Sequence, residues 1–178
     1  LQPNENLRSM FERSVLLVVK TESAAAAKSL TRLCAGLSAW AETDRVRTFW
    51  HVAAAYFEGT GANLMPSDVY AKRAASRILL QFNALMPSEG QVRNPAEVSE
   101  TLLRDLLFFC AFAKGANDEA ATPMLAEVRR VFGLKDAHWV DYEKTSLGQF
   151  DPAQLAQARK RVHAAKDAWG LYTSGDVN

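Results

Sequence analysis

The sequence predicts an all-α protein, an antiparallel bundle of about seven helices. Apolar residues recur at steps of three and four along most of the 178 residues, which is the spacing of one helix face. The period-two alternation of strands is almost absent. Stripes of this width are what helices bury in antiparallel bundles. Polar loops separate the stripes, so the pattern predicts helix after helix rather than a sheet.

Capping residues and helix breakers divide this pattern into separate helices. Asp44 and Ser67 are good N-caps, and Asp151 precedes a proline at the first helical position. Gly59 and Gly61 are expected to end the third helix. The predicted helices span residues 4–20, 23–41, 46–58, 67–85, 96–114, 118–132 and 152–172.

Two boundaries stay open at this point. Pro123 places the start of the sixth helix either near Asp118 or at Thr122, and Gly133 should follow its end. Residues 87–95 form the clearest loop, so the chain is either one helical region over 1–178 or two sub-bundles, 1–86 and 96–178. Because the chain begins with Leu rather than Met, we interpret it as part of a longer polypeptide.

Composition excludes several classes of protein. The 21 basic and 20 acidic residues leave a net charge of +1, which argues against a nucleic-acid partner. No apolar run approaches the roughly 18 residues that would cross a bilayer, so no direct membrane insertion is expected. Cys34 and Cys110 each stand in an apolar helical pattern. Two buried thiols indicate a reducing compartment, and we expect a cytoplasmic protein.

The patterns of metal and cofactor sites are also absent from the sequence. Two cysteines and three histidines do not build a Cys/His metal site, and no histidine follows a glutamate at the Glu-x-x-His spacing of di-metal bundles. No glycine-rich nucleotide motif occurs. His138 stands beside a tryptophan in a predicted loop and receives no role. We therefore expect no metal and no cofactor, with both cysteines structural rather than catalytic.

A histidine acting alone is the chemistry that remains. A helical bundle with one exposed histidine is the design of a histidine phosphotransfer (Hpt) domain, whose usual motif is His-x-x-Lys-Gly. His163 is the first candidate phosphoacceptor, with Lys166 and Arg159 nearby to offset the phosphoryl charge, but Asp167 stands where glycine belongs. His51 is the second candidate and lacks both the lysine and the glycine. A solvated surface histidine is the alternative for both.

Two further groups of side chains suggest surfaces. Lys72, Arg73 and Arg77 share a polar helix face, for which solvation is a better explanation than an anionic partner. The same holds for the basic residues 159–161. Phe108 and Phe112 fall away from the main stripe of the fifth helix. That helix should therefore be central in the bundle or lie at an interface.

Five segments also share their order and spacing with a known family. They are RTFWHVAAAYFE (47–58), DVYAKR (68–73), LLRDLLFF (102–109), VRRVFGL (128–134) and AAKDAW (164–169). In this order they resemble the N-terminal region of the CheA-like hybrid histidine kinases that govern type IV pili and twitching motility. The similarity extends over about residues 11–176. Its motifs are packing motifs rather than catalytic ones.

This resemblance implies an Hpt-like fold and a role in two-component signalling. Such kinases carry strings of Hpt or Hpt-like modules ahead of an ATP-binding core, a coupling domain and a receiver, and some early modules serve as scaffolds. The implied partners are other domains of the parent kinase, response-regulator receiver domains or chemosensory adaptors. The chain has no ATP-binding motifs, so only the parent would be the kinase.

Three hypotheses follow for the function. The first is a non-catalytic Hpt-like module that serves docking or spacing in the signalling array. The second is an active phosphotransfer module that uses His163, with Lys166 and Arg159 in support. The third is a stand-alone helical enzyme or ligand-binding bundle, which requires a deep pocket with convergent polar groups.

Overall fold

Six helices and no strand make up the part of the chain that the computed structural model describes, residues 5–86, 97–114, 120–134, 160–161 and 163. This confirms the all-α class. The chain divides into two units, residues 1–138 and 139–178. All six helices lie in the first unit. In the second unit Lys160, Arg161 and His163 are helical and exposed, and the rest of the seventh predicted helix lies outside the described residues.

The helices follow the predicted order with shifted ends. They are α1 (Glu5–Thr21), α2 (Ala24–Ala39), α3 (Asp44–Gly61), α4 (Val69–Leu85), α5 (Glu100–Ala111) and α6 (Pro123–Val131). The boundary between α1 and α2 is sharp, because Glu22 adopts a left-handed backbone with φ of 53° and Ser23 caps α2. The later of the two predicted starts of the sixth helix is confirmed, with Pro123 as its first residue.

Two predicted N-caps are wrong by one residue. Thr43, not Asp44, caps α3, and its Oγ1 accepts the backbone N–H of Val46 at 3.3 Å. Asp68, not Ser67, caps α4. In both cases the cap is the residue with extended backbone, and Asp44 lies in the first turn, where a carboxylate favours the helix dipole. The fifth helix also begins later than predicted, after its cap Ser99.

Gly59 lies inside α3 and does not end it, contrary to the prediction, whereas Gly61 is the last residue of the helix, as predicted. Their role is close packing. A Cβ at residue 59 would lie 2.5 Å from Cε of Met65, and a Cβ at residue 61 would lie 3.3 Å from Cβ of Ala27 on α2. Glycine therefore serves here to let neighbouring side chains approach the helix, a use that the sequence pattern does not distinguish from a helix stop.

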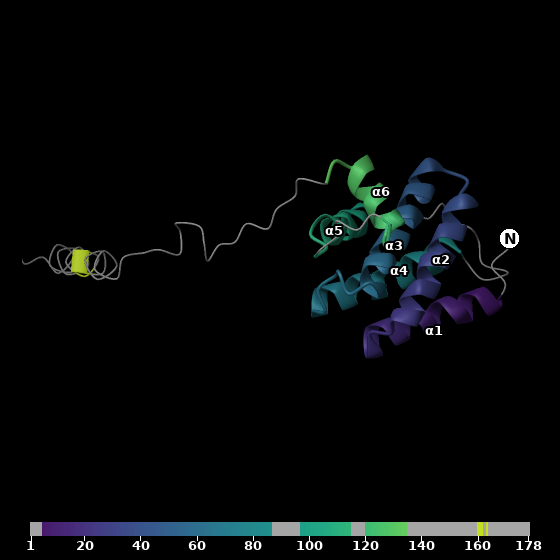
Figure 1. The fold of residues 1–178 in the computed structure, drawn as a ribbon, viewed down its shortest axis with the longest axis horizontal. Coiled ribbons are helices and arrows are strands. Elements are labelled where there is room, and N and C mark those ends of the chain that lie inside the picture. Colours follow the sequence, from purple (N-terminus) through teal and green to yellow (C-terminus); the bar gives the residue numbers. More distant parts are fainter. Residues whose placement is uncertain (1–4, 87–96, 115–119, 135–159, 162, 164–178) are drawn as a thin grey trace, which may run out of the picture. The chain divides into compact units, whose positions relative to one another are not determined.

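Helix α3 is the centre of the first unit, and α2, α5 and α6 pack against it (Figure 1). It is buried nearly all round rather than along one stripe, as a fully enclosed helix must be. Its buried side chains combine large rings with a run of small residues: Phe49, Trp50, Val52, Ala53, Ala54, Ala55, Tyr56 and Phe57. The small residues let the surrounding helices come close.

Aromatic rings join α1 and α4 to this centre. The ring of Phe11 on α1 stacks on that of Phe82 on α4, with 4.3 Å between centroids. Both rings meet the indole of Trp50 edge-on at 6.1 Å. Tyr56 adds a polar link, since its hydroxyl donates to the carbonyl of Ala71 at 2.7 Å. Rings of this size bury the most apolar area per residue, so this cluster is a main source of stability.

The helices on the two sides of residues 87–95 share one core. Gln81 on α4 accepts the backbone N–H of Ser99 at 3.0 Å and donates to the carbonyl of Glu97 at 3.2 Å, which fixes the start of α5. Helix α5 packs on both α3 and α4. The division of the chain into two units falls after residue 138.

Helix α6 is capped by a side chain from another helix. Thr122 at its N-cap position makes no side-chain capping bond, and Oε2 of Glu58 on α3 instead accepts the backbone N–H of Leu125 at 2.8 Å. Burial raises the pKa of Glu58, and the backbone bonds at the start of α6 act in the opposite direction. At its other end, Gly133 adopts φ of 65° and closes the helix with the predicted glycine C′ residue.

Replacing Glu58 tests this cap. Glu58→Ala should lower the free energy of unfolding by about 1–2 kcal/mol, the usual cost of a lost N-cap. Glu58→Gln keeps an oxygen that accepts the N–H of Leu125 and should cost clearly less. Chemical denaturation at neutral pH gives both values. Glu12→Gln, on the exposed side of α1, is the control and should change stability by less than about 0.5 kcal/mol.

The same residue makes stability depend on pH in a defined direction. Because burial raises the pKa of Glu58 above the usual 4.5, the folded state favours the protonated carboxyl. The resulting contribution of Glu58 to the free energy of unfolding is fully present below pH 4.5. It is lost as the pH rises through the pKa of the folded state. The stability of Glu58→Gln relative to the wild type should therefore increase with pH across this window. A constant difference would contradict the raised pKa.

Candidate functional site

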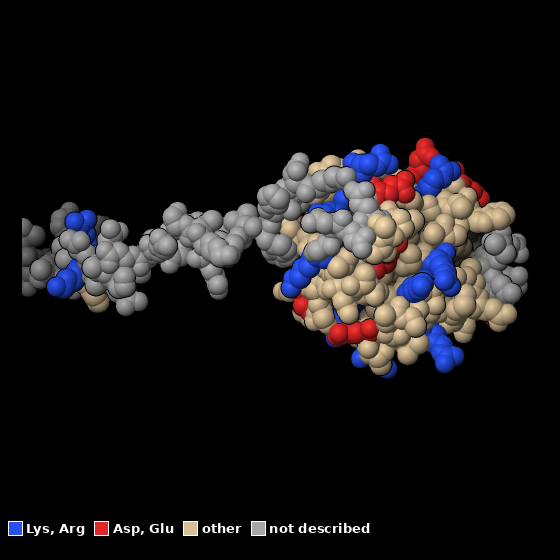
Figure 2. Space-filling model, viewed as in Figure 1, with Lys and Arg blue, Asp and Glu red and all other residues tan. Residues whose placement is uncertain are grey.

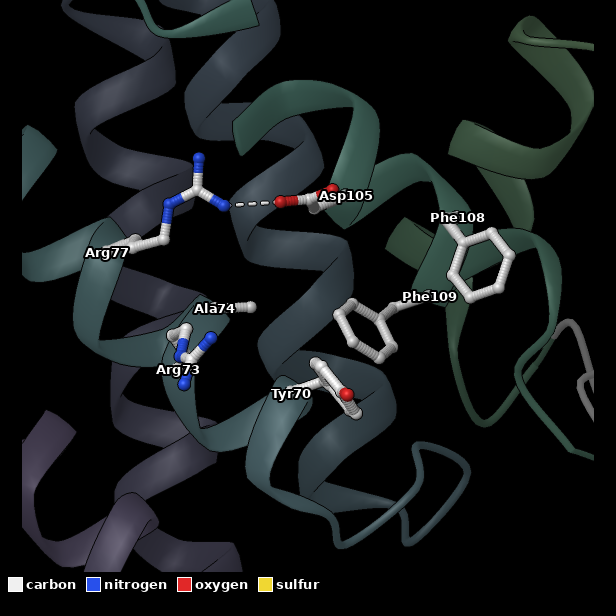
Figure 3. Close-up of a pocket in the computed structure, with 7 residues that line it drawn as sticks. All are labelled: Tyr70, Arg73, Ala74, Arg77, Asp105, Phe108 and Phe109. Atoms are coloured by element: carbon white, nitrogen blue, oxygen red, sulfur yellow. Dashed lines mark hydrogen bonds and ion pairs between the residues drawn. The ribbon is translucent and has the colours of Figure 1, made fainter. Parts of the chain in front are cut away.

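A pocket of about 280 Å³ lies on the surface between α4 and α5 (Figure 3). Apolar and charged side chains divide it. Tyr70 and Phe108 stand on one side with the mostly buried Phe109, while Arg77 and Asp105 face each other on the other side. The remaining lining residues are Arg73 and the buried Ala74. The pocket is thus an aromatic recess beside a charged rim.

The aromatic side of the pocket is exposed and held in place. Tyr70 keeps 67% of its surface and Phe108 keeps 48%, which is high for side chains of this size. The ring of Phe108 contacts those of Phe109 and Phe112 at centroid distances of 6.0 and 4.7 Å. The prediction that Phe108 lies off the core stripe of its helix is confirmed. Exposed aromatic groups with ring neighbours are typical anchors of protein interfaces.

The charged rim carries two arginines that differ in their surroundings. Arg77 forms an ion pair with Asp105 and donates to Oγ1 of Thr101 at 3.0 Å, so both its position and its charge are matched. Arg73 is exposed and has no ion pair within the described part of the chain. Among the described residues, the rim therefore has one arginine in an ion pair, Arg77, and one without, Arg73, beside the aromatic recess.

Lys72, the third basic residue that the sequence places on this helix face, points to other partners. Its Nζ lies 2.9 Å from Oε1 of Glu22, the residue with left-handed backbone between α1 and α2. The hydroxyl of Ser67 donates to the same carboxylate. Ser67 first and Lys72 second lower the pKa of Glu22. Lys72 thus serves the fold, which leaves Arg73 and Arg77 at the pocket.

His51, the second candidate phosphoacceptor, lies on α3 beside α6. Its side chain is one-third exposed, at 33%, and its Nε2 lies 3.2 Å from Oε2 of Glu127. A carboxylate at this distance occupies the nitrogen and would repel an incoming phosphoryl group. His51 and Glu58 are seven residues apart, which places them on the same face of α3. Both contact α6.

His163, the first candidate, is exposed and helical in the second unit. Its proposed supporting residues, Lys166 and Arg159, and the loop residue His138 lie outside the described residues. The structure therefore places the imidazole of His163 at a helix surface. The predicted supporting cations cannot be placed relative to it.

Cys34 and Cys110 are free thiols that lie in the core, as predicted. Burial raises the pKa of both, that of Cys110 to about 12. Since the thiolate is the nucleophile and the metal ligand, this environment disfavours either role. Within the described ranges no group of three metal-ligating side chains occurs, and no helix is long and apolar enough to cross a membrane.

Charges on the first unit are mixed. Figure 2 shows acidic and basic side chains interspersed among uncharged ones on the face drawn. Several of them pair across helices, as Arg45 on α3 does with Glu100 on α5 at 2.8 Å. A surface of this kind suits protein partners, with specificity set by local groups rather than by an overall field.

The chain matches the family described as the FimL scaffold protein second domain, over residues 1–145. It belongs to that family. The match includes all six described helices and the α4–α5 pocket. No curated protein and no solved structure matches the chain.

Family membership changes what the resemblance to CheA-like kinases supports. A scaffold domain is what the family describes, and the link to pilus chemosensory systems is supported. The specific assignment to the N-terminal region of a CheA-like kinase is not supported by this match. The match extends over the first unit, which contains His51, and ends before His163.

The pocket combines residues that the sequence named with residues that it did not. The sequence places Arg73 and Arg77 on a polar helix face and Phe108 off the core stripe of its helix, and it does not single out Tyr70 or Asp105. Tyr70, Arg73 and Arg77 stand at steps of three and four, so their common helix face was readable. The pairing of Arg77 with Asp105 cannot be predicted from the sequence, because it depends on the register of α4 against α5.

Burial of the two cysteines predicts their reactivity. The native chain should leave both thiols unmodified by a chromogenic disulfide reagent at neutral pH, because access is closed and the raised pKa disfavours the thiolate. Both should react after unfolding in guanidinium chloride. Ser76→Cys, on the exposed side of α4, is the positive control and should react at once. Rapid labelling of the native wild type would contradict the core position.

Proposed function

We propose that this chain is a non-catalytic scaffold domain that docks partner proteins of a type IV pilus chemosensory system in the cytoplasm. The observation that carries the proposal is the family match over residues 1–145, which describes a scaffold protein. The partners are proteins of that system, such as response-regulator receiver domains or chemosensory adaptors. The cytoplasmic location rests on the two unpaired, buried thiols.

The surroundings of His51 support a role without phosphotransfer for the first unit. In the Hpt design the imidazole must be open to a receiver domain and flanked by a lysine. Here the Nε2 of His51 faces the carboxylate of Glu127, and Ala54 stands at the position of the lysine. On this proposal the Hpt-like helical frame of a CheA-like ancestor is retained for docking, and its histidine chemistry is lost.

One observation favours a second candidate function. His163 is exposed on a helix, which is the first requirement of a phosphoacceptor. An active phosphotransfer module would use this histidine in the second unit, with Lys166 and Arg159 in support. The phosphoryl group would then pass from a kinase to the imidazole nitrogen and on to a receiver aspartate.

Phosphotransfer assays distinguish the two candidates. The chain is incubated with the radiolabelled, autophosphorylated core of a pilus-type chemosensory histidine kinase. The scaffold proposal predicts no acid-labile label on the chain, because Ala54 stands at the lysine position after His51 and Asp167 at the glycine position after His163. Label that disappears in His163→Gln would overturn the proposal in favour of the second candidate. An authentic Hpt domain that carries the His-x-x-Lys-Gly motif is the positive control.

Motility of whole cells tests the same proposal in vivo. Deleting residues 1–145 should abolish or strongly reduce twitching, while His51→Gln and His163→Gln together should leave it at the wild-type level. Normal twitching after the deletion would show that the scaffold role is wrong.

A further inference from the structure

The α4–α5 pocket is large enough for an anchoring side chain of a partner protein. Its volume of about 280 Å³ lies at the lower limit of ligand pockets, which run from about 300 to 1,000 Å³. An aromatic ring or a large aliphatic side chain fits in such a recess, since a cavity of about 150 Å³ already holds benzene. Tyr70 and Phe108 offer ring surfaces to it, and Ala74 leaves room between the helices. This geometry suits one anchoring side chain of a protein partner.

Charge complementarity identifies what should stand beside that anchor. The ion pair between Arg77 and Asp105 and the bond from Arg77 to Thr101 satisfy the inner rim. The guanidinium of Arg73 has no acidic partner among the described residues, and it lies next to Tyr70 and Ala74 (Figure 3). Arginine pairs with carboxylates through two parallel hydrogen bonds. A partner that brings a carboxylate one or two residues from its anchor would satisfy it.

The helices and the Phe108 ring that frame the pocket are held in position by contacts within the first unit. Gln81 fixes the start of α5 against α4, and the Arg77–Asp105 pair joins the two helices at the pocket itself. The ring of Phe108 is held by Phe109 and Phe112. Binding to groups that are already in position loses less conformational entropy.

From this geometry we propose that the α4–α5 pocket docks an acidic segment of a partner protein, with an aromatic or large aliphatic side chain seated between Tyr70 and Phe108 and a neighbouring carboxylate paired with Arg73. The proposal rests on the proposed scaffold function and names the surface at which a partner would bind. A recess for one side chain buries little area, so the contact is weak and exchanges readily.

Peptide binding to the full 178-residue chain tests the pocket. The probe is the peptide Ser-Glu-Asp-Phe-Glu-Asp-Ser, titrated into labelled protein and followed by amide chemical shifts. We expect saturable shifts on α4 and α5. Replacing the acidic residues of the peptide by lysine, or its phenylalanine by serine, should weaken binding at least about tenfold.

Variants with matched controls complete the test. Arg73→Glu and Tyr70→Ser should each weaken binding about tenfold. Arg13→Glu, an exposed arginine on α1, and Trp40→Ser, which is as exposed as Tyr70 at 67%, should leave it unchanged. All four positions are exposed, so the variants should fold, and thermal unfolding checks this. Equal binding of the acidic and basic peptides, shifts on other helices, or no saturable binding would overturn the proposal.

Twitching assays separate failure of the pocket from failure of the scaffold function. In whole cells Arg73→Glu should reduce twitching and Arg13→Glu should not. If deletion of residues 1–145 stops twitching while Arg73→Glu has no effect, the scaffold function stands and the pocket is wrong. If the deletion has no effect either, the scaffold function itself is wrong.

Discussion

The enclosure of α3 is the constraint on which the rest of the first unit depends. From Phe49 to Gly59 every residue of this helix is buried except His51 and Glu58, which are partly exposed. A helix that is apolar all round is stable only when neighbours cover each side. Helices α2 and α5 and the rings of α1 and α4 cover most of it with apolar groups. What remains is the side that carries the two polar residues.

Helix α6 closes that side by polar contacts as well as apolar ones. Glu58 caps its first turn and His51 meets Glu127 one turn further on, while Leu125 is fully buried between them. Both side chains are partly buried, and each of them has a partner on α6. His51 thus joins the central helix to α6 through its contact with Glu127. The same contact makes α6 part of the core unit.

Much of this fold could be predicted from periodicity, and the exceptions have physical causes. Stripes such as Ala71, Ala75, Ile78 and Phe82 identify helices because burial on one face requires that spacing. Gly59 could not be told from a helix stop, since its role depends on Met65, which approaches from outside the helix. The pocket could not be predicted from the sequence for the same reason. Tyr70 and Arg73 are readable as one face, but their position opposite Phe108 and Asp105 depends on how two helices are placed against each other.

A scaffold domain needs a rigid frame and a few accessible contacts, and the two requirements fall on different residues here. Rings and small side chains around α3 supply the frame, and hydrogen bonds such as those of Gln81 fix the connection into α5. Tyr70, Phe108 and Arg73 stand outside that frame, and none of them is needed to fill the core. Their substitution can therefore change binding at little cost to folding. Because the core and the docking surface use separate side chains, partner choice can vary in this family while the helical frame is kept.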